Sequence, residues 1–296
     1  MQLFVQRLFD GLQAGAIYAI LALAIVVIFR ASGLLNFAQG ELAMFTTFVV
    51  SSFFKAGLPW WAATIVALAV GFALGAVMYR LLIVRLGGPQ GSPLAIVIVT
   101  IGLFLILNDG ARIIWGSDPA KVPRVFGEGR VELLGAGIAV QVLGLLAVLA
   151  VLVVGFSLLF QRTKLGLALR AVTSNQESAA LAGVKVTATL MIGWGLSGAI
   201  GALAGSFTAS QNLGVDANMM QVVLIYAFAA ATLGGFDSPL GAVVGGLILG
   251  VVSELTVGYV DIIGPDLRLL PGFALVLIVL LVRPQGLFGS AAVGRA

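Results

Sequence analysis

The sequence lacks cysteine and histidine altogether, and only 9% of its 296 residues are charged. Without cysteine there is neither a disulfide framework nor a thiolate site for a metal ion. Without histidine the chain also lacks the commonest general base and the commonest metal ligand. Because so few charges cannot cover the surface of a soluble domain of this length, lipid must be the solvent for most of the chain.

What the sequence does contain is long apolar runs, since 60% of its residues are hydrophobic. A helix needs roughly 20 residues to cross the ~30 Å hydrocarbon core of a bilayer. The runs therefore predict an all-α, polytopic membrane protein, a bundle of about eight to ten transmembrane helices. The predicted spans lie near residues 11–29, 37–54, 60–83, 93–114, 138–160, 188–210, 217–235, 239–258 and 267–282.

No segment between the spans is long enough to fold separately, so residues 1–296 are predicted to form a single transmembrane domain. A small excess of Lys and Arg on alternate connections favours an N-terminus outside the cell. With that orientation, residues 161–187 form a cytoplasmic loop, and residues 115–137 form the main external loop.

Glycine pairs spaced four residues apart recur along the predicted spans. Lipid solvates leucine as well as a neighbouring helix does, so membrane helices associate through small residues that let their backbones approach. The pairs are Gly11/Gly15, Gly71/Gly75, Gly201/Gly205, Gly241/Gly245 and Gly246/Gly250. Static packing explains such pairs, and so do helices that slide against one another, but static packing is the commoner case. Gly241 and Gly245, with Gly234 and Gly235 just before them, are candidates for packing or for lining a passage.

Several polar side chains interrupt the apolar runs near the predicted ends of spans. Asn36, Gln39 and Glu41 open the second span and are candidates for lining a passage. Asn36 with Gln39 has the spacing of a capping box, and Asp109 with Arg112 has the spacing of an i,i+3 ion pair. A charge deep in the bilayer would instead indicate a proton or ion relay. Since polar groups near helix ends reach water at little cost, capping and interfacial pairing are the favoured interpretation.

A charged and polar stretch, RTKLGLALRAVTSNQESAALAGVKV, occupies residues 162–186. Its first part, RTKLGLALR, is predicted to extend the fifth span into water. Ser174 and Glu177 then match S-x-x-E, in which each side chain satisfies a free backbone N–H at a helix start. Gly183 is predicted to end this helix, because glycine adopts the left-handed conformation without steric cost. The result is a short helix of about two turns with alanines on one face, suited to a groove in a partner.

Four stretches lie in register from Gly33 to Gly289: GLLNFAQGELAMF, RTKLGLALRAVTSNQESAALAGV, LGGFDSPLGAVVGGLILGVVSEL and RPQGLFG. With these motifs the sequence resembles the LivH-type permeases, transmembrane subunits of ATP-binding-cassette importers for branched-chain amino acids. The resemblance implies that the short helix is a cytoplasmic coupling helix that docks on an ATPase. The coupling residues would be Ser174, Asn175, Glu177, Ala180, Leu181 and Gly183. It also implies a multi-pass location in the inner membrane of a bacterial or archaeal cell.

The resemblance further implies three kinds of partner: a related LivM-type permease that forms a heterodimer with this chain, two ATP-binding-cassette ATPases, and an extracytoplasmic substrate-binding protein. The sequence has no G-x-x-x-x-G-K-[ST] motif, so the chain is not expected to hydrolyse ATP by itself. It is expected to be a non-catalytic subunit that binds no cofactor or metal, with ATP and magnesium held by the partner ATPases. No pattern of basic and aromatic residues indicates nucleic-acid binding.

In the external loop, Lys121, Arg124 and Arg130 alternate with acidic residues. Mixed charge suits a salt-sensitive docking surface for the binding protein, although a solvated loop without a partner explains it equally well. Branched-chain amino acids are the leading substrate, and urea, amides or aromatic acids are the alternative for the same machinery. A stand-alone ion-coupled secondary transporter is a different class, with broken helices expected at matching points of two repeats. A membrane enzyme is disfavoured because no catalytic constellation is found.

Overall fold

The computed structural model describes residues 2–133, 135–260, 262, 264 and 267–289, and the rest of the predicted 1–296 domain lies outside the described residues. The α-helices are α1 (Gln2–Ser32), α2 (Gln39–Lys55), α3 (Trp60–Met78), α4 (Pro93–Trp115), α5 (Val140–Arg162), α6 (Lys164–Ser174), α7 (Gln176–Leu181), α8 (Val186–Asn212), α9 (Gln221–Gly234), α10 (Pro239–Tyr259) and α11 (Leu269–Val282). Short π and 3-10 turns η1 (Tyr79–Ile83), η2 (Val84–Leu86) and η3 (Gly88–Gln90) follow α3. The strands are β1 (Ala120–Lys121), β2 (Arg130–Leu133), β3 (Ala136–Ala139) and β4 (Gly214–Val215).

The predicted all-α, polytopic architecture is confirmed. Among the described residues, six helical segments are long and apolar enough to cross a membrane: Gln2–Ser32, Trp60–Leu86, Pro93–Trp115, Val140–Arg162, Val186–Asn212 and Pro239–Tyr259. The other three predicted spans correspond to shorter helices, namely α2 with 17 residues, and α9 and α11 with 14 residues each. At 1.5 Å per residue, these three helices fall short of a full crossing.

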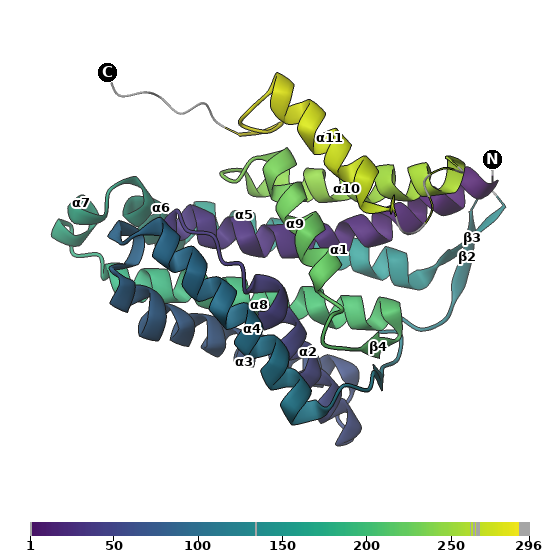
Figure 1. Cartoon of the computed structure of the whole chain (residues 1–296), viewed down its shortest axis with the longest axis horizontal. Coiled ribbons are helices and arrows are strands. Elements are labelled where there is room, and N and C mark those ends of the chain that lie inside the picture. Colours follow the sequence, from purple (N-terminus) through teal and green to yellow (C-terminus); the bar gives the residue numbers. More distant parts are fainter. Residues whose placement is uncertain (1, 134, 261, 263, 265–266, 290–296) are drawn as a thin grey trace.

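Helix α1 is the centre of the bundle. Its middle, from Ala14 to Ile28, is apolar on every side and almost completely buried, as expected of a helix that has neighbours all round. It packs most extensively against α10 and also contacts α8, α9 and α5. In Figure 1, α10 and α11 lie on one side of α1, and α8, α3 and α4 lie on the other.

The glycine pairs predicted from the sequence lie at helix contacts. A Cβ added at Gly15 of α1 would lie 2.8 Å from the Gly246 carbonyl oxygen of α10, and one at Gly11 would lie 2.7 Å from the Val251 Cα. Both distances are shorter than non-bonded atoms normally allow, so only glycine permits this approach of the two backbones. The pair in α3 packs in the same way on the backbone of α8, and the pair in α8 packs on α2, where a Cβ at Gly205 would overlap the Ala43 carbonyl.

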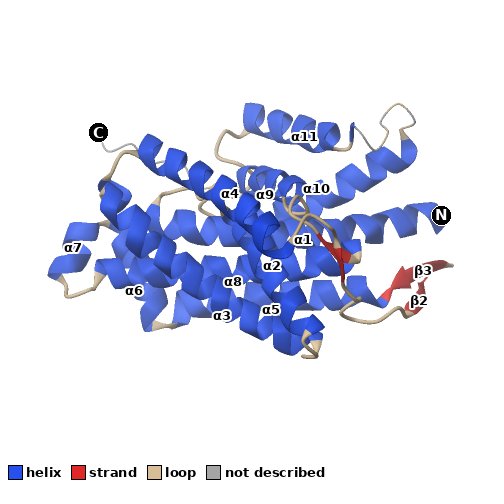
Figure 2. Ribbon diagram, turned by 60° about the horizontal axis from the view of Figure 1, so that its bottom comes forward, coloured by secondary structure: helices blue, strands red, loops and turns tan. Residues whose placement is uncertain are grey.

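The two ends of the bundle differ in structure. Helices α6 and α7 lie at one end, hereafter the α7 end, and the four strands lie at the other, the strand end (Figures 1 and 2). The predicted external loop belongs to the strand end and is partly ordered by strands: β1 pairs antiparallel with β4, and β2 pairs antiparallel with β3. The pairing of Ala120 with Val215 ties this loop to the segment between α8 and α9.

The prediction that RTKLGLALR extends the fifth span is wrong. Helix α5 ends at Arg162, and Thr163 adopts an extended conformation with φ −108° and ψ 155°. The Thr163 hydroxyl accepts a 3.0 Å hydrogen bond from the Gly166 N–H, so it caps the new helix α6. Because α6 buries Leu169 and Val172, it packs against the bundle instead of continuing into water.

Candidate functional site

Helix α7 is the predicted coupling helix, and it starts one residue later than predicted. Its N-cap is Asn175, whose side-chain oxygen accepts a 2.9 Å hydrogen bond from the Ser178 N–H. Ser174 is the last residue of α6, so the predicted capping box of Ser174 with Glu177 does not form. Asn caps a helix as well as Ser does, and the extended backbone of Asn175 places its side chain over the free N–H groups.

The end of α7 confirms the prediction for Gly183. This residue has φ +85°, and its N–H donates to the Ala180 carbonyl at 2.9 Å while the Val184 N–H donates to the Ala179 carbonyl at 3.0 Å. These two bonds form a Schellman motif, which satisfies carbonyls at a helix C-terminus.

One side of α7 faces the bundle and the other faces away from it. Ala179 is 4% exposed, whereas Leu181 is 91% exposed, and Ser174, Glu177, Ala180 and Gly183 are exposed as well. The helix projects from the bundle beyond α6 (Figure 1). Leu181 therefore places a large apolar side chain in the open near the C-terminal end of a projecting helix.

Asn36 and Gln39 lie deeper in the bundle than predicted and do not form a reciprocal capping box. The Gln39 amide is fully buried and donates at 3.0 Å to the carbonyl of Ser197, near the middle of α8. The Asn36 side chain accepts from the Ala38 N–H at 3.1 Å and donates to the Gln39 side chain at 3.2 Å. Helix α2 therefore begins inside the bundle, where these two amides satisfy polar groups at the break in the chain.

Glu41 joins the same buried region to α4. Its carboxylate, on a residue only 1% exposed, accepts a 3.0 Å hydrogen bond from the Asn108 amide, which also donates to the Ala217 carbonyl at 2.8 Å. The predicted pair of Asp109 with Arg112 is not formed, because Arg112 donates to Asn108 at 3.1 Å and to Asn218 at 2.8 Å. This network links α2, α4 and the segment before α9.

The candidate glycines Gly234, Gly241 and Gly245 lie where α9 packs on α10. A Cβ at Gly234 or Gly241 would overlap the backbone of the other residue, and one at Gly245 would overlap the Ala230 carbonyl. Gly235 has φ +100° at the turn between the helices. These close backbone contacts show that Gly234, Gly241 and Gly245 serve packing in this conformation.

The C-terminal RPQGLFG motif packs on the same turn. The N–H groups of Leu287 and Phe288 donate to the carbonyls of Leu233 and Gly234, at 2.8 and 3.1 Å. Two motifs that are well separated in the sequence therefore form one structural unit, in which the last segment satisfies carbonyls at the end of α9. Sequence reasoning did not predict this contact.

At the strand end, the three candidate docking residues differ in exposure. Lys121 and Arg130 are exposed, whereas Arg124 is half-buried. Arg124 and Arg130 line a cavity of about 170 Å³ together with Asp10 of α1. Lys121 is thus the basic residue of the three that lies outside this cavity.

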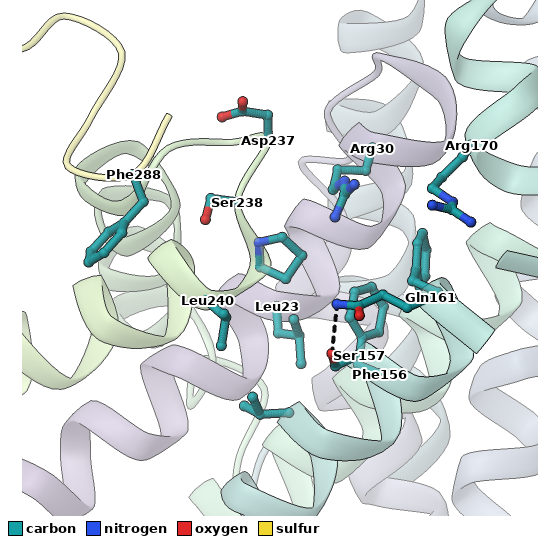
Figure 3. Close-up of a pocket in the computed structure, with 13 residues that line it drawn as sticks. Leu23, Arg30, Phe156, Ser157, Gln161, Arg170, Asp237, Ser238, Leu240 and Phe288 are labelled. Carbon is teal, nitrogen blue, oxygen red and sulfur yellow. Dashed lines mark hydrogen bonds between the residues drawn. The ribbon is translucent and has the colours of Figure 1, made fainter. Parts of the chain in front are cut away.

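A larger cavity, of about 420 Å³, lies at the α7 end between α1, α5, α6 and the start of α10 (Figure 3). Its polar lining includes Arg30 at the end of α1, Arg170 of α6 and Asp237 just before α10. Sequence reasoning missed this site, because the three charged residues come from distant parts of the chain. Among the described residues, no group of three or more acidic side chains could hold a metal ion.

These features define the class of the protein: a multi-pass membrane protein with a helical bundle, broken helices inside it, and a capped helix projecting from one end. The chain belongs to the family described as "Branched-chain amino acid transport system / permease component", whose model matches residues 7–282.

Known relatives align with nearly the whole chain. The permease LivH of Salmonella typhimurium, named for high-affinity branched-chain amino acid transport, is 29% identical over 99% of this chain and 97% of its own length. BraD of Pseudomonas aeruginosa, named for the same transport, is 28% identical over 99% of this chain and 98% of its own length. The fructose import permease FruF of Bifidobacterium longum is 24% identical over 93% of this chain and 76% of its own length. A solved structure, PsaBC from Streptococcus pneumoniae in complex with Fab, has 15% identity and a TM-score of 0.49, covering 95% of this chain and 92% of that chain.

Proposed function

We propose that this chain is the transmembrane permease subunit of an ATP-binding-cassette importer that moves branched-chain, hydrophobic amino acids into the cell. The observation that carries the proposal is the likeness to LivH and BraD, which extends over 97% or more of their length. The α7 end faces the cytoplasm of a bacterial or archaeal cell, and the chain is a multi-pass protein of its inner membrane.

In this function α7 docks on an ATPase. Its exposed face, with Leu181 at the tip, seats in a groove of that subunit, while Asn175 and Gly183 fix its two ends. Movement of α7 reaches the bundle through α6, because the Thr173 hydroxyl donates a 2.5 Å hydrogen bond to the Arg30 carbonyl at the end of α1. Closure of the ATPases would then tilt helices between outward-facing and inward-facing states.

The partners follow from the same proposal. Two ATPases hold the ATP and magnesium, a related LivM-type permease completes the passage, and an extracytoplasmic binding protein delivers the substrate at the strand end. The chain itself is a non-catalytic subunit. A relative named for fructose import is also similar over 93% of this chain. The likeness to relatives therefore supports the transport machinery more strongly than it supports the choice of substrate.

The test is transport by the reconstituted complex. The chain is coexpressed with its companion permease, ATPases and binding protein, and uptake of radiolabelled leucine into proteoliposomes is compared with that of urea, an aromatic acid and fructose. We expect ATP-dependent uptake of leucine, and none when the ATPases are omitted. Uptake by this chain alone, driven by an ion gradient, would assign it to the secondary transporters instead. ATP-dependent uptake of another solute would support the proposed ATP-binding-cassette importer but would show that its substrate is not a branched-chain amino acid.

A further inference from the structure

The cavity at the α7 end is lined in two zones. Arg30, Arg170 and Asp237 lie at one end, and Leu23, Val153 and Phe156 are among its apolar lining (Figure 3). Leu23 lies seven residues before Arg30 on α1, so it is about 10 Å deeper along the helix axis. A second cavity of about 450 Å³ adjoins the first and shares its charged residues. The combined space suits a ligand with a charged end and an apolar body.

The charges in this cavity favour an anion. Neither Arg30 nor Arg170 takes part in the salt bridges found among the described residues, which join Glu254 to Arg7 and Arg268. The Arg30 guanidinium lies 5.5 Å from the centre of the Phe160 ring, which holds it at the cavity by a cation–π contact. Asp237 offsets one of the two guanidinium charges, so the three residues together leave one positive charge.

The cavity also has exposed apolar residues at its rim. Leu240 of α10 is 60% exposed, and Phe288 of the C-terminal segment is 53% exposed. On α5, the outward residues Val154 and Leu158, each next to a lining residue, are exposed too. An apolar rim on membrane-spanning helices is suited to contact with acyl chains, as expected of a cavity that opens toward the bilayer.

We propose that this cavity binds an anionic phospholipid of the cytoplasmic leaflet, with its phosphate between Arg30 and Arg170 and an acyl chain along Leu23 and Leu240. The assignment of the leaflet rests on the proposed function, which places the α7 end in the cytoplasm. Basic pockets between transmembrane helices on this side of a membrane are suited to anionic head groups. The bound lipid would bridge α1 and α6, and α6 leads directly into the coupling helix.

The binding test uses native mass spectrometry of the delipidated full complex with phosphatidylglycerol, and with phosphatidylcholine of the same acyl chains. We expect phosphatidylglycerol to bind in preference to phosphatidylcholine. Each arginine contributes about fivefold in affinity for an anionic head group, so the double variant Arg30→Gln/Arg170→Gln should bind phosphatidylglycerol roughly 25-fold more weakly. Arg162→Gln is the matched control, since Arg162 is an exposed arginine at the end of α5 that does not line the cavity. Equal binding of the two lipids, or equal loss in the control, would overturn the proposal.

Two further experiments distinguish a bound lipid from a smaller bound solute. Leu240→Trp leaves both arginines in place but fills the rim, so it should weaken phosphatidylglycerol binding. Phosphatidylglycerol binding that survives Leu240→Trp unchanged would place the lipid elsewhere and reject this site. Inorganic phosphate or leucine at millimolar concentration should not displace the lipid, and displacement by either would assign the cavity to that solute. Because lipid binding is measured without transport, its failure leaves the proposed function standing, and a failure of leucine transport leaves lipid binding measurable.

Discussion

At the scale of single residues, the start of α7 depends on Asn175. Its side chain accepts the 2.9 Å hydrogen bond from the Ser178 N–H, and the loss of such a cap costs about 1 kcal/mol. Asn175→Ala should therefore fray the first turn of α7 and lower the stimulation of ATPase activity by loaded binding protein. Ser174→Ala is the control and should leave this stimulation close to wild type, because Ser174 belongs to α6. Equal effects of the two variants would mean that Asn175 does not act as the cap.

Gly183 ends the same helix for a conformational reason. Its φ is +85°, while a Cβ added there would meet no atom within 4 Å, so a substitution is opposed by the backbone and not by a neighbour. Gly183→Val should misdirect α7 at a cost of roughly 1–2 kcal/mol, uncoupling ATP hydrolysis from the binding protein without unfolding the chain. Gly183→Asn, which tolerates the left-handed conformation, should retain most of the coupling. Wild-type stimulation in the valine variant would refute this account.

At the scale of elements, the contact between α9 and α10 requires glycine on both sides. A Cβ at Gly241 would overlap the Gly234 backbone, so Gly241→Ala must push the two helices apart. We expect the free energy of unfolding to fall by about 1–3 kcal/mol, the usual cost of overpacking, measured as thermal unfolding in detergent. Gly102→Ala on α4 is the control, since a Cβ there meets nothing within 4 Å and alanine favours a helix. If the Gly241→Ala variant is as stable as this control, α9 and α10 can move apart without loss of stability, and the contact does not require glycine.

At the scale of the whole molecule, the strand end is the predicted docking surface for the binding protein. Lys121 is exposed and Arg124 is half-buried, so most of the electrostatic effect should come from Lys121. Lys121→Glu/Arg124→Glu should raise the concentration of binding protein needed for half-maximal ATPase stimulation, and Lys121→Glu alone should give most of that rise. The effect should shrink as salt is added, because exposed charges are screened. If the concentration of binding protein needed for half-maximal stimulation does not change, these residues take no part in docking the binding protein.

Assembly is a property of the whole molecule as well. Helix α7 has six residues, too few to bury the more than ~1,000 Å² that a stable interface usually needs. Two permeases, each presenting its own coupling helix, are therefore expected to hold the ATPase pair. Native mass spectrometry of the coexpressed complex should show a heterodimer of this chain with a related permease. A single copy of this chain that carries two ATPases would contradict the need for two coupling helices. A homodimer would keep that need but would show that the second permease is another copy of this chain.

The sequence by itself determined where most of the helices form, their order and the end of α7, but not that α6 is separate from α5. Apolar runs show where helices form in lipid, and Gly183 shows where one stops, because both depend on residues within a few turns. The cap was misplaced by one residue because Ser174 and Asn175 are both good caps. What chose between them was the extended backbone of Asn175, set by the turn between α6 and α7.

Only the tertiary structure decided which polar groups meet. Gln39 bonds to α8, Glu41 bonds to Asn108, and Arg30 shares a cavity with Arg170, although each pair is distant in the sequence. A helix that is apolar all round, as α1 is, carries no amphipathic pattern to fix its rotation or its neighbours. The rotation of α1 and the choice of its neighbours are set by the close approach of glycine backbones and by the need of each buried polar group for a partner. Both of these interactions exist only once the whole bundle has assembled.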